Sequence, residues 1–290
     1  MNDIVKLAHV TKRYKEFQLG PLDVSIPRGC ITGLIGPNGA GKTTTLQILM
    51  NIINPDSGDV TILDMQHKTA EISIKNCIGY VGEVQHYYED QTVSWTAQFV
   101  SKFYNDWNAN LFENLLHDFK ISRSKKIKAL SKGMKLKFSI ALALSHNPAL
   151  IIMDEPTSGL DPIVRREVLN YLKKFVDEDP EKSVIISTHI TNDLERIADY
   201  IIFLIDGKVV LYDSKDNLTA NWKKINFQEE IIGQEIIAKL FEVEKNMFGC
   251  CAFTDSYPEI EKMIDPIKNS NGLKIENVGL DDILLCLLRR

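Results

Sequence analysis

Short apolar blocks alternate along the chain with longer segments of helical periodicity. Apolar blocks of strand length occupy residues 4–7, 22–26, 30–35, 150–153, 183–187 and 200–205. Segments of helical length occupy residues 43–53, 162–178 and 191–198. Few strand signals occur between 84 and 147, where Leu111, Leu115 and Phe119 recur every four residues, as on one helix face. Because strands and helices alternate, the pattern predicts an α/β fold with a parallel sheet.

The pattern changes at about residue 219. Beyond it, apolar stretches occupy residues 236–243, 248–253, 257–267, 273–278 and 280–288, and the last is typical of a helix. We therefore predict a larger domain at 1–218, with a helical subdomain at about 84–147. A C-terminal α/β accessory domain would follow at 219–290. This accessory domain either packs as a structural appendix or works as a regulatory, ligand-sensing module.

Composition narrows the class of protein. The 290 residues include 34 Lys and Arg against 39 Asp and Glu, a net charge of −5, which argues against a non-specific nucleic-acid binder. No run of 18 apolar residues and no signal-peptide pattern occur, so we do not expect this chain to cross a membrane. The five cysteines follow no zinc spacing, and free thiols are favoured over a metal site or a catalytic thiol. We expect the adjacent Cys250 and Cys251 to lie in a buried strand.

A glycine-rich segment follows the strand at 30–35. Residues 36–43 read Gly-Pro-Asn-Gly-Ala-Gly-Lys-Thr and fit the phosphate-binding loop G-x-x-x-x-G-K-[ST]. In such a loop backbone N–H groups point at phosphate oxygens, and the positive end of the following helix faces the anion. Lys42 would contact the β- and γ-phosphates, and the Thr43 hydroxyl would contact Mg²⁺. The strand before the segment and the helix after it disfavour a simple glycine turn.

The apolar strand at 150–153 ends in two carboxylates, Asp154 and Glu155. In a phosphate-loop enzyme we expect Asp154 to hold Mg²⁺ through its water shell and Glu155 to orient the attacking water. A helix cap is the alternative for Asp154, two residues before Pro156. The phosphate-binding loop upstream favours the interpretation that Asp154 holds Mg²⁺ over the interpretation that it caps a helix.

Five motifs in order carry a family resemblance. They are Tyr14, residues 36–43, Leu-Ser-Lys-Gly-Met at 130–134, Asp-Glu-Pro-Thr-Ser-Gly-Leu-Asp at 154–161 and Ser-Thr-His at 187–189. Together they resemble the nucleotide-binding subunit of an ABC transporter over about residues 1–215. Other phosphate-loop ATPases lack the signature segment at 130–134. The resemblance implies a P-loop NTPase fold of ABC type, with a small antiparallel β subdomain beside the helical subdomain.

The resemblance also implies roles for residues. Glu155 corresponds to the general base, His189 to the switch histidine that senses the γ-phosphate, and 158–161 to a dimer-contacting segment. Ser131 and Gly133 would contact ATP bound to the opposite protomer, and Tyr14 would stack on adenine, unless it is an ordinary surface tyrosine. The ATP-binding set is then Tyr14, Gly36, Pro37, Asn38, Gly39, Ala40, Gly41, Lys42, Thr43, Thr44, Ser131, Gly133 and Asp161.

Two departures from the family pattern matter. Lys132 and Met134 replace the commoner Gly and Gln of the signature and resemble a subgroup that exports antibiotics, lantibiotics and other amphipathic peptides in Gram-positive bacteria. Where the family has a metal-contacting glutamine, alignment on Tyr80-Val81 places Glu83, with Gln85 as the rival. The implied metal contacts are thus Thr43, Glu83 and Asp154.

The implied assembly is a dimer, either of two copies or with a related ATPase subunit, that closes around two ATP molecules with Mg²⁺. Dimer closure would act on separate transmembrane permease subunits and drive export. The chain would lie peripherally on the cytoplasmic face of the cell membrane, in contact with the membrane only through the permease and with no nucleic acid. An importer motor and a soluble non-transport ABC ATPase are the alternatives.

Overall fold

The computed structural model describes residues 3–228, 231–247, 249–265 and 272–290. The chain divides into two compact units, Met1–Leu211 and Tyr212–Arg290, here called unit 1 and unit 2. The division falls within strand β10 (Lys208–Ser214), upstream of residue 218, where the change of sequence pattern places the boundary. None of the helices in the described residues has the length and apolar character needed to cross a membrane.

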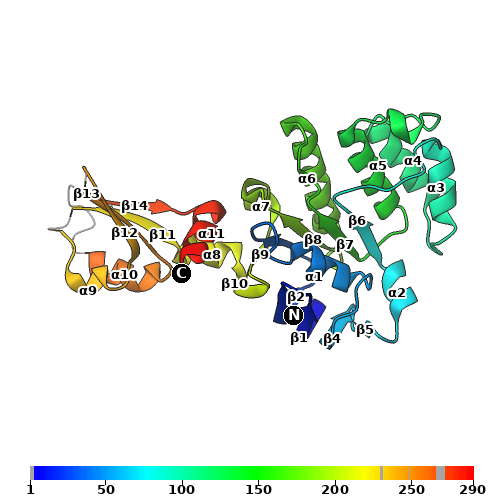
Figure 1. Ribbon diagram of the computed structural model, residues 1–290. Coiled ribbons are helices and arrows are strands. Elements are labelled where there is room, and N and C mark those ends of the chain that lie inside the picture. Colours follow the sequence, from blue (N-terminus) through cyan, green and yellow to red (C-terminus); the bar gives the residue numbers. More distant parts are fainter. Residues whose placement is uncertain (1–2, 229–230, 248, 266–271) are drawn as a thin grey trace. The chain divides into compact units, whose positions relative to one another are not determined.

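A mainly parallel sheet forms the centre of unit 1 (Figure 1). In the described residues it has six strands in the order β10-β9-β3-β8-β7-β6, and the neighbouring pairs from β9 to β6 run parallel. Its other strands are β3 (Ile31–Ile35), β6 (Ile78–Val81), β7 (Leu150–Asp154), β8 (Ser183–Thr188) and β9 (Tyr200–Ile205). Every residue of β3, β7 and β8 is buried, as parallel strands covered on both faces require. The predicted α/β fold with a parallel sheet is therefore confirmed.

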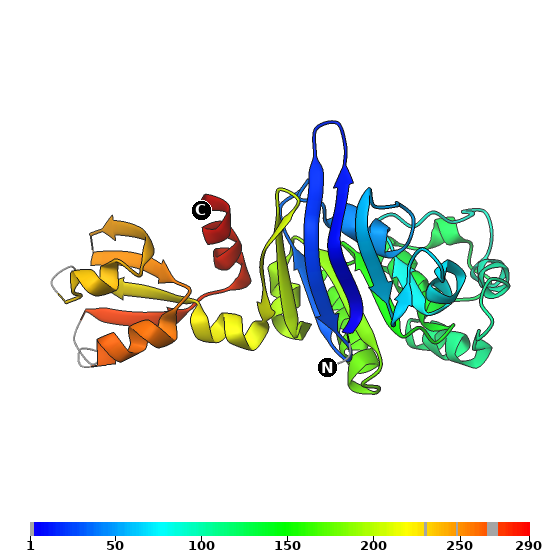
Figure 2. The ribbon, with the colours of Figure 1, turned by 90° about the horizontal axis from the view of Figure 1, so that it is seen from below.

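Helices α1 (Lys42–Leu49), α6 (Pro162–Asp177) and α7 (Thr191–Ile197) follow β3, β7 and β8, and α2 (Glu71–Asn76) precedes β6. A smaller antiparallel sheet in the described part of unit 1 has the order β2-β1-β4-β5 (Figure 2). Its strands are β1 (Asp3–Arg13), β2 (Gln18–Pro27), β4 (Ser57–Ile62) and β5 (Met65–Gln66). Figure 1 shows α1 between this sheet and the parallel sheet, which agrees with the burial of Leu46, Ile48 and Leu49.

The segment between β6 and β7 is helical, as predicted. It contains α3 (Val93–Ser101), α4 (Ala109–Asp118), the 3₁₀ turn η1 (Ile127–Ala129) and α5 (Lys132–Leu144). Thr92, Asn108 and Ser131 cap α3, α4 and α5 with their side-chain oxygens. On the predicted apolar face of α4, Leu115 and Phe119 are buried and Leu111 is half-buried.

Unit 2 begins with α8 (Lys215–Asn221) and ends with α11 (Leu280–Arg289). Between them the chain forms β11 (Lys223–Phe227), α9 (Gln234–Ile237), β12 (Phe241–Asn246), β13 (Gly249–Thr254), α10 (Tyr257–Ile264) and β14 (Leu273–Asn277). The strands pair antiparallel in the order β12-β13-β11-β14, the split β-α-β arrangement of ferredoxin-like folds. Ile225, Ala252, Ile260 and Ile264 form the centre of its core. Residues 248, 266 and 267 of the predicted apolar stretches lie outside the described residues.

Candidate nucleotide-binding site

The loop between β3 and α1 has the tight backbone of a phosphate-binding loop. Ala40 N–H donates to the Pro37 carbonyl at 3.2 Å. A Cβ at Gly36 would lie 2.1 Å from the Leu204 carbonyl oxygen, so only glycine fits beside β9. Gly41 has φ 104°, a conformation that favours glycine, and it turns the chain into α1. The glycines thus permit the curvature that aims backbone N–H groups at one point.

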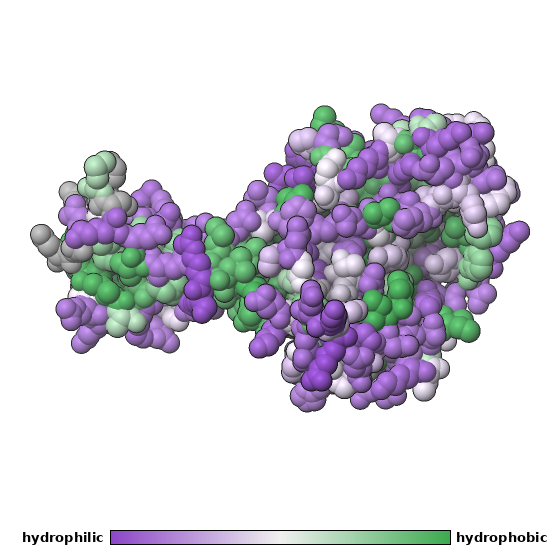
Figure 3. Space-filling view, in the orientation of Figure 1, coloured by the Kyte–Doolittle hydropathy of each residue, from purple (hydrophilic) through white to green (hydrophobic). Residues whose placement is uncertain are grey.

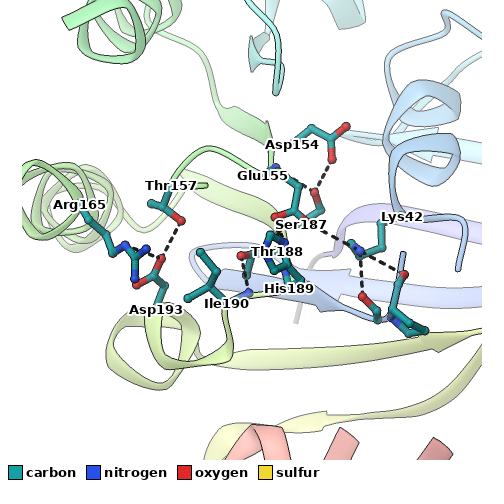
Figure 4. A network of polar contacts seen from close by, with 12 residues as sticks. Lys42, Asp154, Glu155, Thr157, Arg165, Ser187, Thr188, His189, Ile190 and Asp193 are labelled. Atoms are coloured by element: carbon teal, nitrogen blue, oxygen red, sulfur yellow. Dashed lines mark hydrogen bonds and ion pairs between the residues drawn. The ribbon is translucent and has the colours of Figure 1, made fainter. Parts of the chain in front are cut away.

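Lys42 opens α1 and is only 6% exposed. Its Nζ donates to the carbonyl oxygens of Gly36 at 2.8 Å and Pro37 at 3.3 Å. Nζ also lies 3.5 Å from Glu155 Oε1 (Figure 4). A buried ammonium needs acceptors and a countercharge, and these three groups supply them. They hold the cation at the mouth of the loop, where a phosphate would accept its hydrogen bonds.

Two carboxylates and a serine meet where β7 and β8 end side by side. The register pairs Asp154 with Ser187. The Ser187 hydroxyl donates to Asp154 Oδ1 and accepts from the Glu155 N–H at 3.2 Å. Ser187 therefore orients both acidic residues from the neighbouring strand. Sequence reasoning treated it only as the residue before Thr188 and His189; its place at the end of a buried strand was the available signal.

Glu155 and His189 form a direct pair. His189 Nδ1 lies 2.7 Å from Glu155 Oε2, and the His189 backbone N–H donates to the same oxygen at 3.3 Å. Because a carboxylate only accepts hydrogen bonds, Nδ1 carries the proton and Nε2 remains available. Glu155 has φ 46°, an uncommon conformation for a residue with a side chain, and such conformations cluster at functional sites. Figure 4 shows the two side chains facing each other from adjacent strand ends.

These groups border an open cavity of about 710 Å³, a volume suited to a small-molecule ligand. Tyr14 is 45% exposed, and its ring centroid lies 6.4 Å from that of Phe17 at an interplanar angle of 28°. Phe17 also borders the cavity and was not predicted, and Ser158, which was predicted only as part of the dimer-contacting segment 158–161, borders it too. The lining residues are Tyr14, Phe17, Asn38, Gly39, Gly41, Lys42, Thr43, Thr44, Glu83, Glu155, Ser158 and His189.

The two candidates for the metal-contacting loop differ in position. Glu83 borders the cavity, whereas Gln85 does not and its Nε2 donates to the Gly82 carbonyl at 3.2 Å. Thr43 supplies a hydroxyl at the cavity wall. Asp154 is the last residue of β7 and directly precedes Glu155, which borders the cavity. This all-oxygen donor set is the kind that Mg²⁺ prefers, with phosphates and waters completing its coordination. No group of three or more His, Cys, Asp or Glu in the described residues is arranged to hold a metal alone.

Six predicted ATP-contacting residues are not among those that border the cavity: Gly36, Pro37 and Ala40, which belong to the phosphate-binding loop itself, and Ser131, Gly133 and Asp161, which lie outside that loop. Ser131 caps α5 and accepts from the Met134 N–H at 3.3 Å. Asp161 caps α6 and accepts from the N–H groups of Ile163 and Val164 at 3.1 and 3.0 Å.

The starts of α5 and α6 are close neighbours. A Cβ at Gly133 would lie 3.1 Å from a Val164 methyl, and one at Gly159 would lie 2.9 Å from Lys132 Nζ. The signature segment at 130–134 and the segment at 158–161 therefore form one surface of the chain.

The cysteines contribute no group to the cavity wall. None of the five forms a disulfide bond in the described residues, Cys250 is buried in β13 and Cys251 is half-buried there. Burial raises the pKa of the Cys30 and Cys77 thiols, and burial together with nearby Glu242 raises that of Cys286 to about 12. Thiols of raised pKa stay protonated near neutral pH and are poor nucleophiles.

Comparison with known proteins gives consistent matches. The family model described as ABC transporter matches residues 19–158. A bacitracin transport ATP-binding protein of Bacillus licheniformis is 32% identical over 232 residues, which are 79% of this chain and 76% of that protein. A lantibiotic transport ATP-binding protein of Streptococcus pyogenes is 31% identical over 221 residues, 74% of this chain and 94% of that protein.

Solved structures agree with these sequence matches. A dimeric ATP-binding cassette in a post-hydrolysis state, bound to ADP and Pi, superimposes with a TM-score of 0.65 and 28% identity. The match covers 72% of this chain and 98% of that cassette.

Proposed function

Because this chain belongs to the ATP-binding proteins of ABC transporters, an ATPase family, we propose that it is the motor subunit of a peptide or antibiotic exporter. The observation that carries the proposal is the convergence of Lys42, Thr43, Glu155 and His189 on one cavity. ATP would lie with its phosphates on the loop at 36–43 and its base near Tyr14. Closure around ATP and reopening after hydrolysis would then drive transport.

Hydrolysis would rest on the Glu155–His189 pair. Lys42 and the loop N–H groups stabilise negative charge on the phosphates, the main term in phosphoryl transfer. Glu155 Oε2 is held by His189, so the carboxylate is positioned to accept a proton from the attacking water. A His189 ring protonated on both nitrogens would donate Nδ1–H to Glu155 and Nε2–H to the γ-phosphate. Two side chains from neighbouring strands thus position water and phosphate together.

We propose that Thr43, Glu83 and Asp154 bind Mg²⁺ together with the nucleotide phosphates. The ion would neutralise phosphate charge as the bond to the leaving group breaks. Ser187 keeps Asp154 in place through its hydroxyl. Glu83 is preferred to Gln85 because it borders the cavity.

Two chains would make each complete site. Ser131, Gly133 and Asp161 are conspicuous as predicted ATP contacts that lie outside the cavity wall, on the shared surface formed by α5 and α6. A second copy, or a related ATPase subunit, would bring this surface to the open side of the cavity. The dimeric cassette among the matched structures supports this arrangement.

The test is Glu155→Gln in the full chain. The amide fills the same space but cannot take a proton from water, so hydrolysis should fall by at least about 10²-fold while Mg-ATP still binds. The trapped complex should elute as a dimer in size-exclusion chromatography with Mg-ATP. Lys42→Ala in the same background is the matched control and should stay monomeric. A Glu155→Gln monomer at saturating Mg-ATP would contradict the proposed two-chain site.

An exposed aromatic cluster is the proposed contact for the permease. The rings of Tyr88, Trp95, Phe99 and Phe103 contact one another in this order, with successive centroids 5.7, 5.4 and 5.3 Å apart; Trp95 and Phe99 are stacked and the other two pairs meet edge to face. Tyr88 and Phe103 are 63% and 66% exposed, and Figure 3 shows hydrophobic atoms at the surface in the region of α3. Large exposed apolar groups mark interaction surfaces. Tyr88 lies only five residues after Glu83, which borders the cavity, so the permease and the nucleotide would contact the same loop.

The cargo is proposed to be an amphipathic peptide antibiotic. Lys132 and Met134 in the signature support this, as do the relatives named for bacitracin and lantibiotic transport. The chain would then lie on the cytoplasmic face of the membrane, held by its permease. Deleting the chain should make its host more sensitive to bacitracin or to a lantibiotic. Unchanged sensitivity to both would contradict the cargo and leave the ATPase assignment intact.

A further inference from the structure

A second hydrogen bond joins the two loops that carry Glu155 and His189. Thr157 lies two residues beyond Glu155, and Asp193 lies four beyond His189. The Thr157 hydroxyl donates to Asp193 Oδ2 at 2.6 Å, and the two residues are 2% and 4% exposed (Figure 4). A short bond to a buried carboxylate is among the stronger hydrogen bonds in proteins. The two loops are therefore joined by the Glu155–His189 contact and also by the Thr157–Asp193 hydrogen bond.

Arg165 on α6 approaches the same carboxylate. Its Nε lies 3.8 Å from Asp193 Oδ2, beyond hydrogen-bond distance. This Nε is buried and has no hydrogen-bond partner in the described residues. A buried donor left unpaired is unfavourable, and a small shift of α6 toward α7 would pair it. Arg165 lies four residues after Asp161, so it moves with the helix start that borders segment 158–161.

Asp193 thus receives one contact from each of two neighbouring parts of the chain. Thr157 ties it to the strand end that carries Glu155, and Arg165 ties it to the start of α6. His189 belongs to the loop that leads into α7, the helix of Asp193. Asp193 therefore connects the start of α6, next to segment 158–161, with the loops that carry Glu155 and His189.

We propose that Asp193 is a positioning residue for hydrolysis, which couples segment 158–161 to the Glu155–His189 pair through Thr157 and Arg165. This inference rests on the proposed function, in which segment 158–161 contacts the partner chain. Contact with the partner moves α6, Arg165 closes on Asp193, and Thr157 sets the position of Glu155. Hydrolysis is thereby favoured when the second chain is in place. Neither Thr157 nor Asp193 touches the nucleotide in this scheme.

The first experiment compares Thr157→Val with Thr157→Ser in the full chain. Valine keeps the shape of threonine and removes the hydroxyl, whereas serine keeps the hydroxyl. For Thr157→Val we expect kcat for ATP hydrolysis to fall on the order of 10-fold, because small misplacements of catalytic groups have large effects on rate. KM for ATP should stay within about 2-fold, because the substrate contacts are intact. Thr157→Ser should restore kcat, which a requirement for the threonine methyl group would not predict.

The second experiment uses Asp193→Asn, alone and combined with Thr157→Val. Asparagine still accepts a hydrogen bond from Thr157 but carries no charge for Arg165. The rate of ATP hydrolysis per chain by Asp193→Asn should therefore no longer depend on protein concentration, while the affinity for ATP is unchanged. If the two residues act as one unit, the double variant should lose little more kcat than Thr157→Val alone. Fully additive losses would overturn the proposal.

The outcomes separate this inference from the proposed function. A wild-type chain that hydrolyses ATP, with a Thr157→Val variant of equal kcat, would refute the positioning role and leave the proposed function standing. A wild-type chain without ATPase activity, or a Glu155→Gln chain that does not dimerise, would instead contradict the proposed function. A fall in kcat that Thr157→Ser also shows would assign Thr157 to packing and overturn the inference.

Discussion

Tyr14 and Phe17 border the cavity from the same turn but differ in what they contact. A Cβ at Gly41 would meet the Phe17 ring at 2.9 Å, so Phe17 packs against the phosphate-binding loop. Tyr14 is more exposed than Phe17 and also borders the cavity. An exposed aromatic ring beside a phosphate site is well placed to stack on a base.

Tyr14→Ala should weaken ATP binding by roughly 1–3 kcal/mol, the usual value of one base–aromatic stack. Titration calorimetry with ATP measures it, and Tyr14→Phe is the matched control because it keeps the ring. Inorganic triphosphate, which has no base, should bind the wild type and Tyr14→Ala equally. If Tyr14→Ala binds ATP as tightly as the wild type does, Tyr14 is an ordinary surface residue.

Residues that act through local spacing could be predicted, and residues that act across the sheet could not. Gly36, Lys42 and Thr43 follow one another in a loop whose geometry depends on their own order. Ser187 and the Thr157–Asp193 bond each join positions more than thirty residues apart. Their contacts depend on the β7–β8 register, which no single stretch of sequence encodes.

At the scale of elements, α3 and the residues on either side of it present the aromatic cluster of Tyr88, Trp95, Phe99 and Phe103. If this cluster binds the permease, a photoreactive phenylalanine analogue in place of Phe103 should cross-link to a protein with several membrane spans in the host membrane. Basal ATPase activity should not change, because Phe103 does not border the cavity. The same analogue in place of the exposed Ile72, on α2, is the control and should not cross-link. A cross-link to a second copy of this chain would contradict the assignment.

Some elements were missed because their pattern is weak. β4 contains Ser57, Gly58 and Asp59 and has only two fully buried positions, Val60 and Ile62. β6 has four residues, one of them glycine. In both, pairing with β1 or β7 supplies the stability that intrinsic preference does not. The strands that were predicted have most of their apolar residues buried, and a run of apolar residues in a sequence indicates a buried strand.

At the scale of the whole chain, two compact units should unfold separately. Calorimetry of the full chain should give two transitions, and Mg-ATP should raise only the Tm of unit 1, which carries the cavity. At 100 times Kd the ligand adds about 2.7 kcal/mol to the stability of the unit that binds it. Lys42→Ala is the control and should abolish the shift. A shift of both transitions, or of the second alone, would contradict confinement of the nucleotide to unit 1.

The separation of Ser131, Gly133 and Asp161 from the cavity has a kinetic consequence. If a complete site needs surfaces from two chains, turnover is second order in protein when the chain is dilute. The rate per molecule should then fall on dilution, even with ATP in excess. Tethering by a permease would remove this dependence, because it fixes the local concentration of the second chain. The membrane partner would thus bring the two ATPase chains together as well as provide a path for the cargo.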